Sequence, residues 1–347
     1  MPASIFDRVV RPTFKRVVTA EHRCSDHILG LLYAPKGDRL VVVPTTGAPE
    51  LWSGAQGQVR LRLEGHGGDV LAASWSPDGE YVVTGGQDGT ARVWQAATGG
   101  CVAVLSMGQG WVEQVAYAPT GAYIAVSCGK RLSLFQPNGV RVQVFEPQAS
   151  TIMGLQWLFN GKLVGCCAYG GVSFFHPGGA EALSGFAWKG SLIALAWSPR
   201  GDYLVAGCQD GALHAWRTEN GEDFEMSGYR TKVRELSWDS AGRFLASGGG
   251  LYPVIWDFSG EGPAGRSPLE LRLHTTLLSA LSFRPGRTWL LVGAQEGGLS
   301  MWDLSKPRQP LLCEALGASV TQVSWHAQGM QFAVGLSDGH VQLCTWR

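Results

Sequence analysis

Charged residues are scarce in this sequence. They occupy only 16% of its 347 positions, and the formal net charge is zero. A typical globular protein carries roughly 25%. Nonspecific affinity for nucleic acids comes mainly from Lys and Arg side chains on phosphates. The neutral balance therefore excludes a general polyanion-binding protein, and we expect no nucleic acid among the partners.

Long apolar runs and paired cysteine motifs are also missing. No stretch approaches the ~20 apolar residues of a membrane span. The first residues, MPASIFDRVVRPTFKRVV, lack the apolar core of a secretory leader. The eight cysteines show no CxxC spacing, and the only close pair is Cys166-Cys167. This usage indicates a reduced chain without a disulfide framework. We expect a cytoplasmic protein that does not contact a membrane.

Motifs that carry catalysis or bind cofactors are not found. The sequence has no P-loop, no GxSxG, no HExxH and no EF-hand pattern. Cys128, Cys167 and Cys208 recur late in the expected second strand of neighbouring repeats, and their thiolates could suit a soft metal. Matching positions diverge around a ring, however, and free Cys is an ordinary small buried residue. We therefore predict no catalytic residue, no cofactor and no metal.

What the sequence does contain is a pattern repeated eight times, every 40 to 46 residues. A fixed period in this range is the signature of a repeat fold. An aromatic residue precedes the first turn of each copy, and a bulky residue closes the copy. The aromatic positions are Tyr33, Trp75, Tyr117, Trp157, Trp197, Trp238, Phe283 and Trp325, and the closing positions are Trp52, Trp94, Phe135, Phe175, Trp216, Trp256, Trp302 and Cys344.

The second copy shows how one repeat is expected to fold. Residues 70–75 read as a buried strand, and the turn Ser76-Pro77-Asp78-Gly79 follows. A second strand at 81–84, a turn at 87–89 and a third strand at 90–94 come next. A fourth strand near 102–105 completes the unit. Four antiparallel strands with short turns form one blade of a β-propeller.

These residues resemble the WD40 repeat family over nearly the whole chain. Two copies end in Trp-Asp, at Trp256-Asp257 and Trp302-Asp303, and the Gly-His element stands at Gly65-His66. In that family His, Ser or Thr, Asp and Trp form a hydrogen-bonded network inside a blade. The resemblance assigns this network to the second blade alone, which we expect to be the stiffest. Its members are His66, Thr84, Asp88 and Trp94.

The repeat count predicts an all-β fold: a closed propeller of eight four-stranded blades, formed by residues 1–347 as a single domain. The chain ends just after the eighth third strand, at Arg347. Residues 14–19 have strand character, so we expect this segment to supply the missing fourth strand and to close the ring, since an open ring leaves unpaired edges. The alternative is seven blades and an irregular module.

A partner site is predicted on the top face, where residues flanking the first strands point in WD40 proteins. Fourteen Trp residues occur, and Trp111 is the one that the repeat does not require. A Trp beside apolar residues and flanked by Arg has the composition of an interaction hot spot. The alternative is that these side chains pack beneath the top loops. The predicted contact residues are Trp111, Leu71, Met153, Ile193, Tyr229, Arg230, Lys232 and Arg234.

The sequence therefore predicts a non-catalytic scaffold that presents its top face to a protein or peptide. Segments such as GWVEQVAYAPTGAYIAVSCGKRLSLF look similar to bacterial stand-alone WD40 proteins, some of them encoded near CobW-type GTPases. That resemblance implies a link to metal homeostasis and a CobW-type GTPase as partner. The alternative function is a propeller enzyme or a small-ligand binder that uses the central channel.

Overall fold

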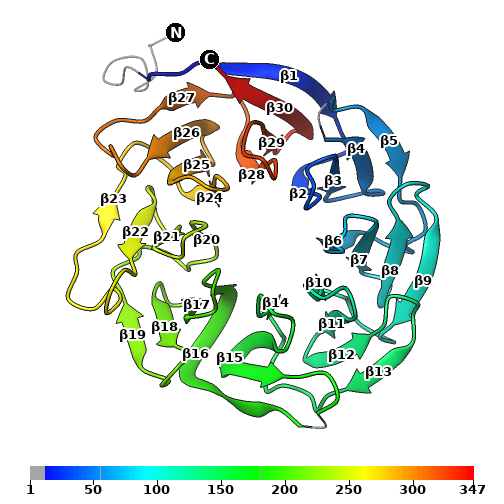
Figure 1. Ribbon diagram of the computed structural model, residues 1–347. Helices are drawn as coiled ribbons and strands as arrows, with labels where there is room; N and C mark the ends of the chain where they lie inside the picture. The colour runs from blue at the N-terminus through cyan, green and yellow to red at the C-terminus, as the bar shows by residue number, and fades with distance from the viewer. Residues whose placement is uncertain (1–11, 55, 180) are drawn as a thin grey trace.

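The computed structural model describes residues 12–54, 56–179 and 181–347, which form a ring of β-strands around an open axis (Figure 1). Within these ranges no helix is long and apolar enough to cross a membrane. Each regular repeat folds into an antiparallel sheet with its first strand nearest the axis and its fourth at the rim.

The first three repeats each form one four-stranded sheet, in chain order from axis to rim. Their strands are β2 (Ile28–Tyr33), β3 (Arg39–Pro44), β4 (Glu50–Ser53) and β5 (Val59–Arg62); β6 (Val70–Trp75), β7 (Tyr81–Gly86), β8 (Thr90–Gln95) and β9 (Cys101–Ser106); and β10 (Gln114–Tyr117), β11 (Ile124–Cys128), β12 (Arg131–Phe135) and β13 (Arg141–Val144).

The sixth and seventh repeats are equally regular, and the last repeat is completed by the N-terminal strand. Their strands are β20 (Leu236–Trp238), β21 (Phe244–Ser247), β22 (Val254–Asp257) and β23 (Leu269–Glu270); β24 (Leu278–Phe283), β25 (Trp289–Ala294), β26 (Gly298–Asp303) and β27 (Leu312–Ala315); and β28 (Val320–Trp325), β29 (Phe332–Leu336), β30 (His340–Trp346) and β1 (Arg16–Arg23).

The prediction of eight four-stranded blades is wrong. The described strands form seven hydrogen-bonded sheets, and counting each sheet as a blade gives seven blades. Six sheets have four strands. The seventh has six, because the fourth and fifth sequence repeats share it. Its strands are β14 (Gly154–Trp157), β15 (Val164–Phe175), β16 (Leu183–Trp197), β17 (Tyr203–Cys208), β18 (Leu213–Arg217) and β19 (Asp223–Met226).

Two long strands join these repeats. β15 continues through the position where the other repeats turn, with Gly170 and Gly171 at φ of 97° and 136°. These angles are available to Gly at little cost. β16 runs from the rim of the fourth repeat to the axial position of the fifth, pairing first with β15 and then with β17. Its Phe186 and Trp188 pack on Trp216 and His214, with ring centroids 5.2 and 3.9 Å apart.

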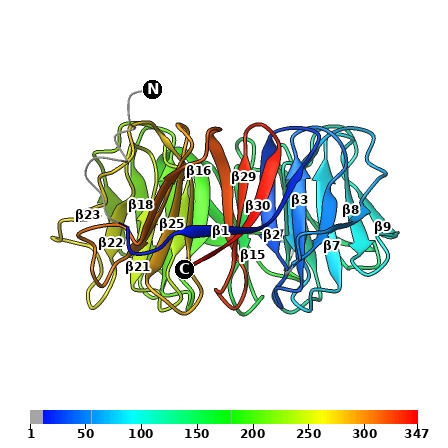
Figure 2. The same cartoon turned by 90° about the horizontal axis from the view of Figure 1, so that it is seen from above.

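The segment near the N-terminus pairs with the last strand of the chain. β1 is antiparallel to β30, from Arg16 opposite Trp346 to Arg23 opposite His340. The strand therefore begins within the predicted range of 14–19 and extends beyond it. Figure 2 shows β1 crossing the outside of the ring beside β30. Phe14 N also donates to Leu311 O at 2.7 Å, which ties this strand to the preceding blade.

The core lies between neighbouring blades. Val83 and Val93 of the second repeat, for example, pack with Val115 and Phe135 of the third. Four of the five Trp residues in the described first strands also bond across this boundary, and Trp197 Nε1 is the exception. Trp75 Nε1 donates to Leu32 O at 2.8 Å, and three others donate in the same way to the blade before them. The repeated aromatic position thus supplies both apolar area and a hydrogen bond between blades.

Candidate functional site

The top face is formed by the loops that enter the first strands and by the turns between second and third strands. Backbone hydrogen bonds join these two kinds of segment. Val112 N donates to Gly86 O at 3.0 Å, and Val233 N donates to Cys208 O at 3.1 Å. Each pair connects the entry loop of one repeat to the turn of the repeat before it. The loop positions on this face are therefore fixed by backbone contacts.

Trp111 lies on this face in the loop between β9 and β10, and 56% of its surface is exposed. The loop turns outward at Gly108 and Gly110, whose φ values are 81° and 114°. The next residue, Val112, is fully buried and packs in the core, which anchors the loop. Trp111 borders a hollow of about 520 Å³, called here the Trp111 hollow, lined by Gln109, Gly110, Trp111, Glu113, Cys128, Gly129, Lys130, Arg131 and Pro147.

The charged side chains of the Trp111 hollow differ in how firmly they are held. Glu113 Oε2 accepts a hydrogen bond from Gly129 N at 2.9 Å. Arg131 Nη2 donates to Gln109 O and lies 3.2 Å from Cys128 Sγ, so its guanidinium braces the loop. Lys130 is exposed at the rim. Neither Lys130 nor Arg131 forms an ion pair with another described residue.

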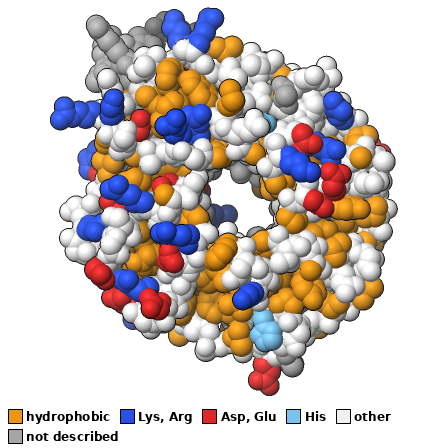
Figure 3. Space-filling view, in the orientation of Figure 1, with side chains coloured by type: hydrophobic (Ala, Val, Ile, Leu, Met, Phe, Trp, Pro, Cys, Tyr) orange, Lys and Arg blue, Asp and Glu red, His pale blue; other side chains and the backbone are white. Residues whose placement is uncertain are grey.

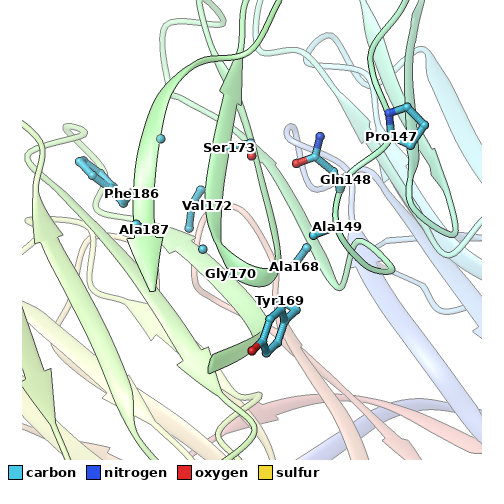
Figure 4. A pocket seen from close by; sticks show the side chains of 12 residues that line it. Pro147, Gln148, Ala149, Ala168, Tyr169, Gly170, Val172, Ser173, Phe186 and Ala187 are labelled. Carbon is cyan, nitrogen blue, oxygen red and sulfur yellow. The ribbon is translucent and has the colours of Figure 1, made fainter. Parts of the chain in front are cut away.

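A second hollow of about 410 Å³ adjoins the first, because Pro147 lines both. Figure 4 shows its walls, formed by β15, β16 and the loop of Pro147, Gln148 and Ala149, with Tyr169 at one end. Tyr169 is 56% exposed. Tyr169 is not among the contact residues predicted from the sequence. The signal was an aromatic residue at the point of the repeat where the second copy has its turn at 87–89.

The predicted apolar contact residues lie at different depths. Met153 is 36% exposed, and its carbonyl accepts a hydrogen bond from Gln114 Nε2 at 3.4 Å. Leu71 is half-buried and borders a third hollow on the strands nearest the axis. Ile193 is 8% exposed and is therefore part of the core. Of this group, Trp111 and Met153 present the most surface to a partner.

Tyr229 has a partner inside its own blade. Its hydroxyl lies 2.7 Å from Ser247 Oγ and accepts a hydrogen bond from Trp256 Nε1 at 2.7 Å. Burial raises the pKa of Tyr229 to about 12. The phenol thus occupies the place that His66 holds in the second repeat, which leaves it little freedom to contact a partner.

The predicted basic residues of the sixth repeat are exposed. Arg230, Lys232 and Arg234 alternate with the half-buried Thr231 and the buried Val233 in the loop before β20. None of these three cations forms an ion pair of 4.0 Å or less within the described residues. They therefore leave positive charge in the loop before β20, and Figure 1 shows β20 on the opposite side of the ring from β10.

The predicted network of the second repeat is present as a chain of hydrogen bonds. His66 Nδ1 lies 3.1 Å from Asp88 Oδ1, and His66 Nε2 lies 2.8 Å from Thr84 Oγ1. Trp94 Nε1 donates to the same hydroxyl at 2.8 Å. Burial opposes ionisation of Asp88, but hydrogen bonds from Gly67, Thr90 and His66 outweigh it and lower the pKa of Asp88 to about 2.

The expectation that only one blade carries such a network is wrong. In the seventh repeat His274 Nδ1 lies 3.0 Å from Glu296 Oε1, and His274 Nε2 lies 2.9 Å from Ser300 Oγ. Trp302 Nε1 donates to Ser300 Oγ at 3.0 Å. The hydroxyl comes from the third strand instead of the second, and Glu replaces Asp. A search at fixed family positions misses this arrangement for that reason.

The strands nearest the axis are largely apolar. Figure 3 shows the channel open through the ring. A hollow of about 400 Å³ on β2, β6, β10 and β28 is lined by one charged residue, Glu113, besides apolar residues, Gly and two Gln. In the described part of the chain, no three His, Cys, Asp or Glu side chains gather as metal ligands would. Cys128, Cys167 and Cys208 are buried, and burial raises the pKa of the last two to about 12.

Comparison with known proteins supports this architecture. The family model "WD domain, G-beta repeat" matches residues 57–95 and 183–217. Human WD repeat-containing protein 55 is 27% identical over 158 residues, covering 44% of this chain and 39% of that protein. The ribosome biogenesis protein ERB1 of Coprinopsis cinerea is 26% identical over 179 residues, covering 51% of this chain and 22% of that protein.

Two further similarities complete the comparison. Protein HIR1 of Cryptococcus neoformans is 25% identical over 177 residues, which cover 44% of this chain and 20% of that protein. The crystal structure of the computationally designed Ika8 protein superposes with a TM-score of 0.80 at 21% identity, over 93% of this chain and 98% of that one. This likeness shows the fold alone. The chain spans about two fifths or less of each of these curated relatives.

Proposed function

We propose that this β-propeller of WD40 repeats is a scaffold that docks a protein or peptide on its top face. The docking site is the Trp111 hollow together with the adjoining second hollow, which Tyr169 borders. The repeats provide a rigid ring, and its loops carry side chains that the ring does not need. The relatives include WD-repeat proteins, and a protein-binding role is consistent with that similarity.

The observation that carries the proposal is the exposure of Trp111. A large aromatic side chain that is 56% exposed loses much of the free energy that burial supplies, and Trp111 contributes little to any blade interior. Tyr169 is exposed to the same extent beside the next hollow. Trp and Tyr are enriched among the residues that dominate binding energy in interfaces. A contiguous apolar patch is typical of an interaction site, and Pro147 lines both of the hollows that Trp111 and Tyr169 border.

The channel is a weaker candidate. A propeller enzyme or small-ligand site gathers charged or metal-binding groups at the axis, whereas the hollow on the axial strands is lined by one carboxylate, Glu113, which already accepts a hydrogen bond from Gly129 N. A role in metal homeostasis, a CobW-type GTPase as partner, an origin among bacterial stand-alone WD40 proteins and a cytoplasmic location remain predictions from sequence. The relatives found do not support the CobW link.

The proposal is tested by identifying a partner through affinity capture and mass spectrometry, and then measuring its affinity by calorimetry with purified proteins. Trp111→Ala is expected to weaken binding by ~2–4 kcal/mol, the range of an interface hot spot. Phe159→Ala is the matched control. Phe159 is 55% exposed, in the turn between the first two strands of the fourth repeat, on the opposite face. Equal affinity of the two variants contradicts the proposal.

A further inference from the structure

We propose that the segment bound at the Trp111 hollow is an acidic stretch of polypeptide, with an apolar side chain in the hollow and a carboxylate beside Lys130. This inference rests on the proposed function and adds the chemistry of the partner. It follows from how positive and negative charges are distributed over the top face, and not from the net charge of the chain.

Four acidic groups of the top face are engaged or partly buried within the fold, whereas Glu64 and Asp210 are exposed. Asp88 and Glu296 bond to His66 and His274 in the two blade networks. Glu113 accepts a hydrogen bond from Gly129 N at the wall of the hollow. Glu235 is half-buried, and burial raises its pKa above the ordinary value. The carboxylates of Asp88, Glu113 and Glu296 keep their charge but are directed at groups of the fold, which limits their contact with a partner.

Apart from Arg131, whose guanidinium donates to Gln109 O, the basic groups of the same face are not engaged in this way. They are exposed, except for the half-buried Arg131, and none has an ion-pair partner within 4.0 Å among the described residues. Their members are Lys130, Arg131, Lys189, Arg230, Lys232 and Arg234.

The Trp111 hollow combines this charge with apolar walls. Trp111 and Pro147 provide apolar surface, and Lys130 stands at the rim with its ammonium free. Arg131 is already committed to Gln109 O, so Lys130 is the cation available for a new contact. A carboxylate on the ligand can pair with it, while Arg230 and Lys232 across the channel add to the potential that attracts an acidic segment.

A polypeptide fits these features better than a nucleic acid. The hollow is mainly apolar, and it has one free cation at its rim among the described lining residues. Binding to a phosphate backbone relies on many such contacts. Pro147 separates two adjoining hollows, so an extended segment can place one apolar side chain in each.

The inference is tested by selecting binders from a display library of random peptides on the full-length chain, followed by titration of the enriched peptides. We expect them to combine an apolar residue with neighbouring Asp or Glu. Lys130→Glu is expected to weaken their binding by roughly fivefold to tenfold. Lys162→Glu is the control. Lys162 is exposed and lies in a turn between first and second strands, on the opposite face.

The possible results separate this inference from the proposed function. If peptides bind in a Trp111-dependent manner but lack acidic residues, or bind Lys130→Glu and Lys162→Glu equally, the acidic partner is wrong and the docking site stands. If no enriched peptide is weakened by Trp111→Ala, both are wrong. Tighter binding of a single-stranded RNA oligomer than of any peptide, again dependent on Trp111, overturns the assignment to polypeptide.

Discussion

Trp188 lies over the imidazole of His214, with ring centroids 3.9 Å apart and the planes inclined by 31°. Trp188 is on β16 and His214 on β18, so the stack fixes the long shared strand against the fifth repeat. His214 also pairs with Asp223 at 3.1 Å through Nε2. The contact explains how a Trp can occupy a position where other repeats have His.

We predict that Trp188→Ala lowers the free energy of unfolding by about 3 kcal/mol, the lower end for loss of a packed aromatic side chain. The change removes the stack on His214. Phe159→Ala serves as control, because exposed substitutions usually change stability by ~0.5 kcal/mol or less. Both variants are compared in urea titrations. Similar midpoints contradict the role assigned to this stack.

Ring closure leads to a second prediction. Removal of residues 1–19 takes away the first part of β1, including the pairs of Arg16, Val17 and Val18 with β30. The freed edge of β30 then presents unpaired backbone groups, which favour association with other chains. We expect a lower melting temperature and aggregation in light scattering. A truncated chain that stays monomeric and melts with the parent would show that this strand does not close the ring.

The two blade networks predict similar costs for losing their carboxylates. Asp88→Ala and Glu296→Ala each leave buried hydrogen-bonding groups unpaired, which costs about 1–3 kcal/mol. Asp338→Ala is expected to cost less, since its partner His340 is half-exposed, whereas the side chains of His66 and His274 are buried. Denaturant titrations of the three variants test this order. A loss at Asp338 as large as the other two contradicts it.

The same carboxylates predict how stability depends on pH. The pKa values of Asp88 and Glu296 are about 2 in the folded chain, below their ordinary values of 3.8 and 4.5. Their contribution is therefore complete above about pH 4.5 and is lost as pH falls toward 2. Burial lowers the pKa of His66 below its ordinary value of 6.5. Protonation of this ring as the pH falls below 6.5 therefore adds to the loss of stability.

This pH dependence can be measured by thermal melts of the parent chain and of the double variant Asp88→Asn, Glu296→Gln. The variant should be less stable at neutral pH, and its melting temperature should change less between pH 4.5 and 2. Melting temperatures that fall by the same amount in the parent chain and in the double variant over this range would contradict the prediction.

Much of the fold could be predicted from the sequence because its signals are local. Alternating apolar residues and Gly-containing turns define strands such as β6 and β7 wherever the chain places them. The number of separate sheets is not local. It depends on whether a strand breaks between repeats, and in β16 the packing of Phe186 and Trp188 on the fifth repeat decides that.

The site could be predicted only in part, for a related reason. Trp111 stood out because the repeat pattern did not require it. Tyr229 was assigned to the surface, yet its hydroxyl is bonded to Ser247 and Trp256 inside the blade. Ser300 was missed because it reaches His274 from an unexpected strand. Two side chains can fill the same role from different places in the repeat, as Thr84 and Ser300 do. A comparison of aligned sequence positions does not find such pairs.

We predict that Trp111 serves binding and not folding. The most direct measurement compares Trp111→Ala with the parent chain in a thermal melt and in calorimetric titration of one purified partner or peptide. We expect an unchanged melting temperature, because 56% of this side chain is exposed, and a loss of ~2–4 kcal/mol in binding. A large fall in melting temperature, or undiminished affinity, would contradict this prediction.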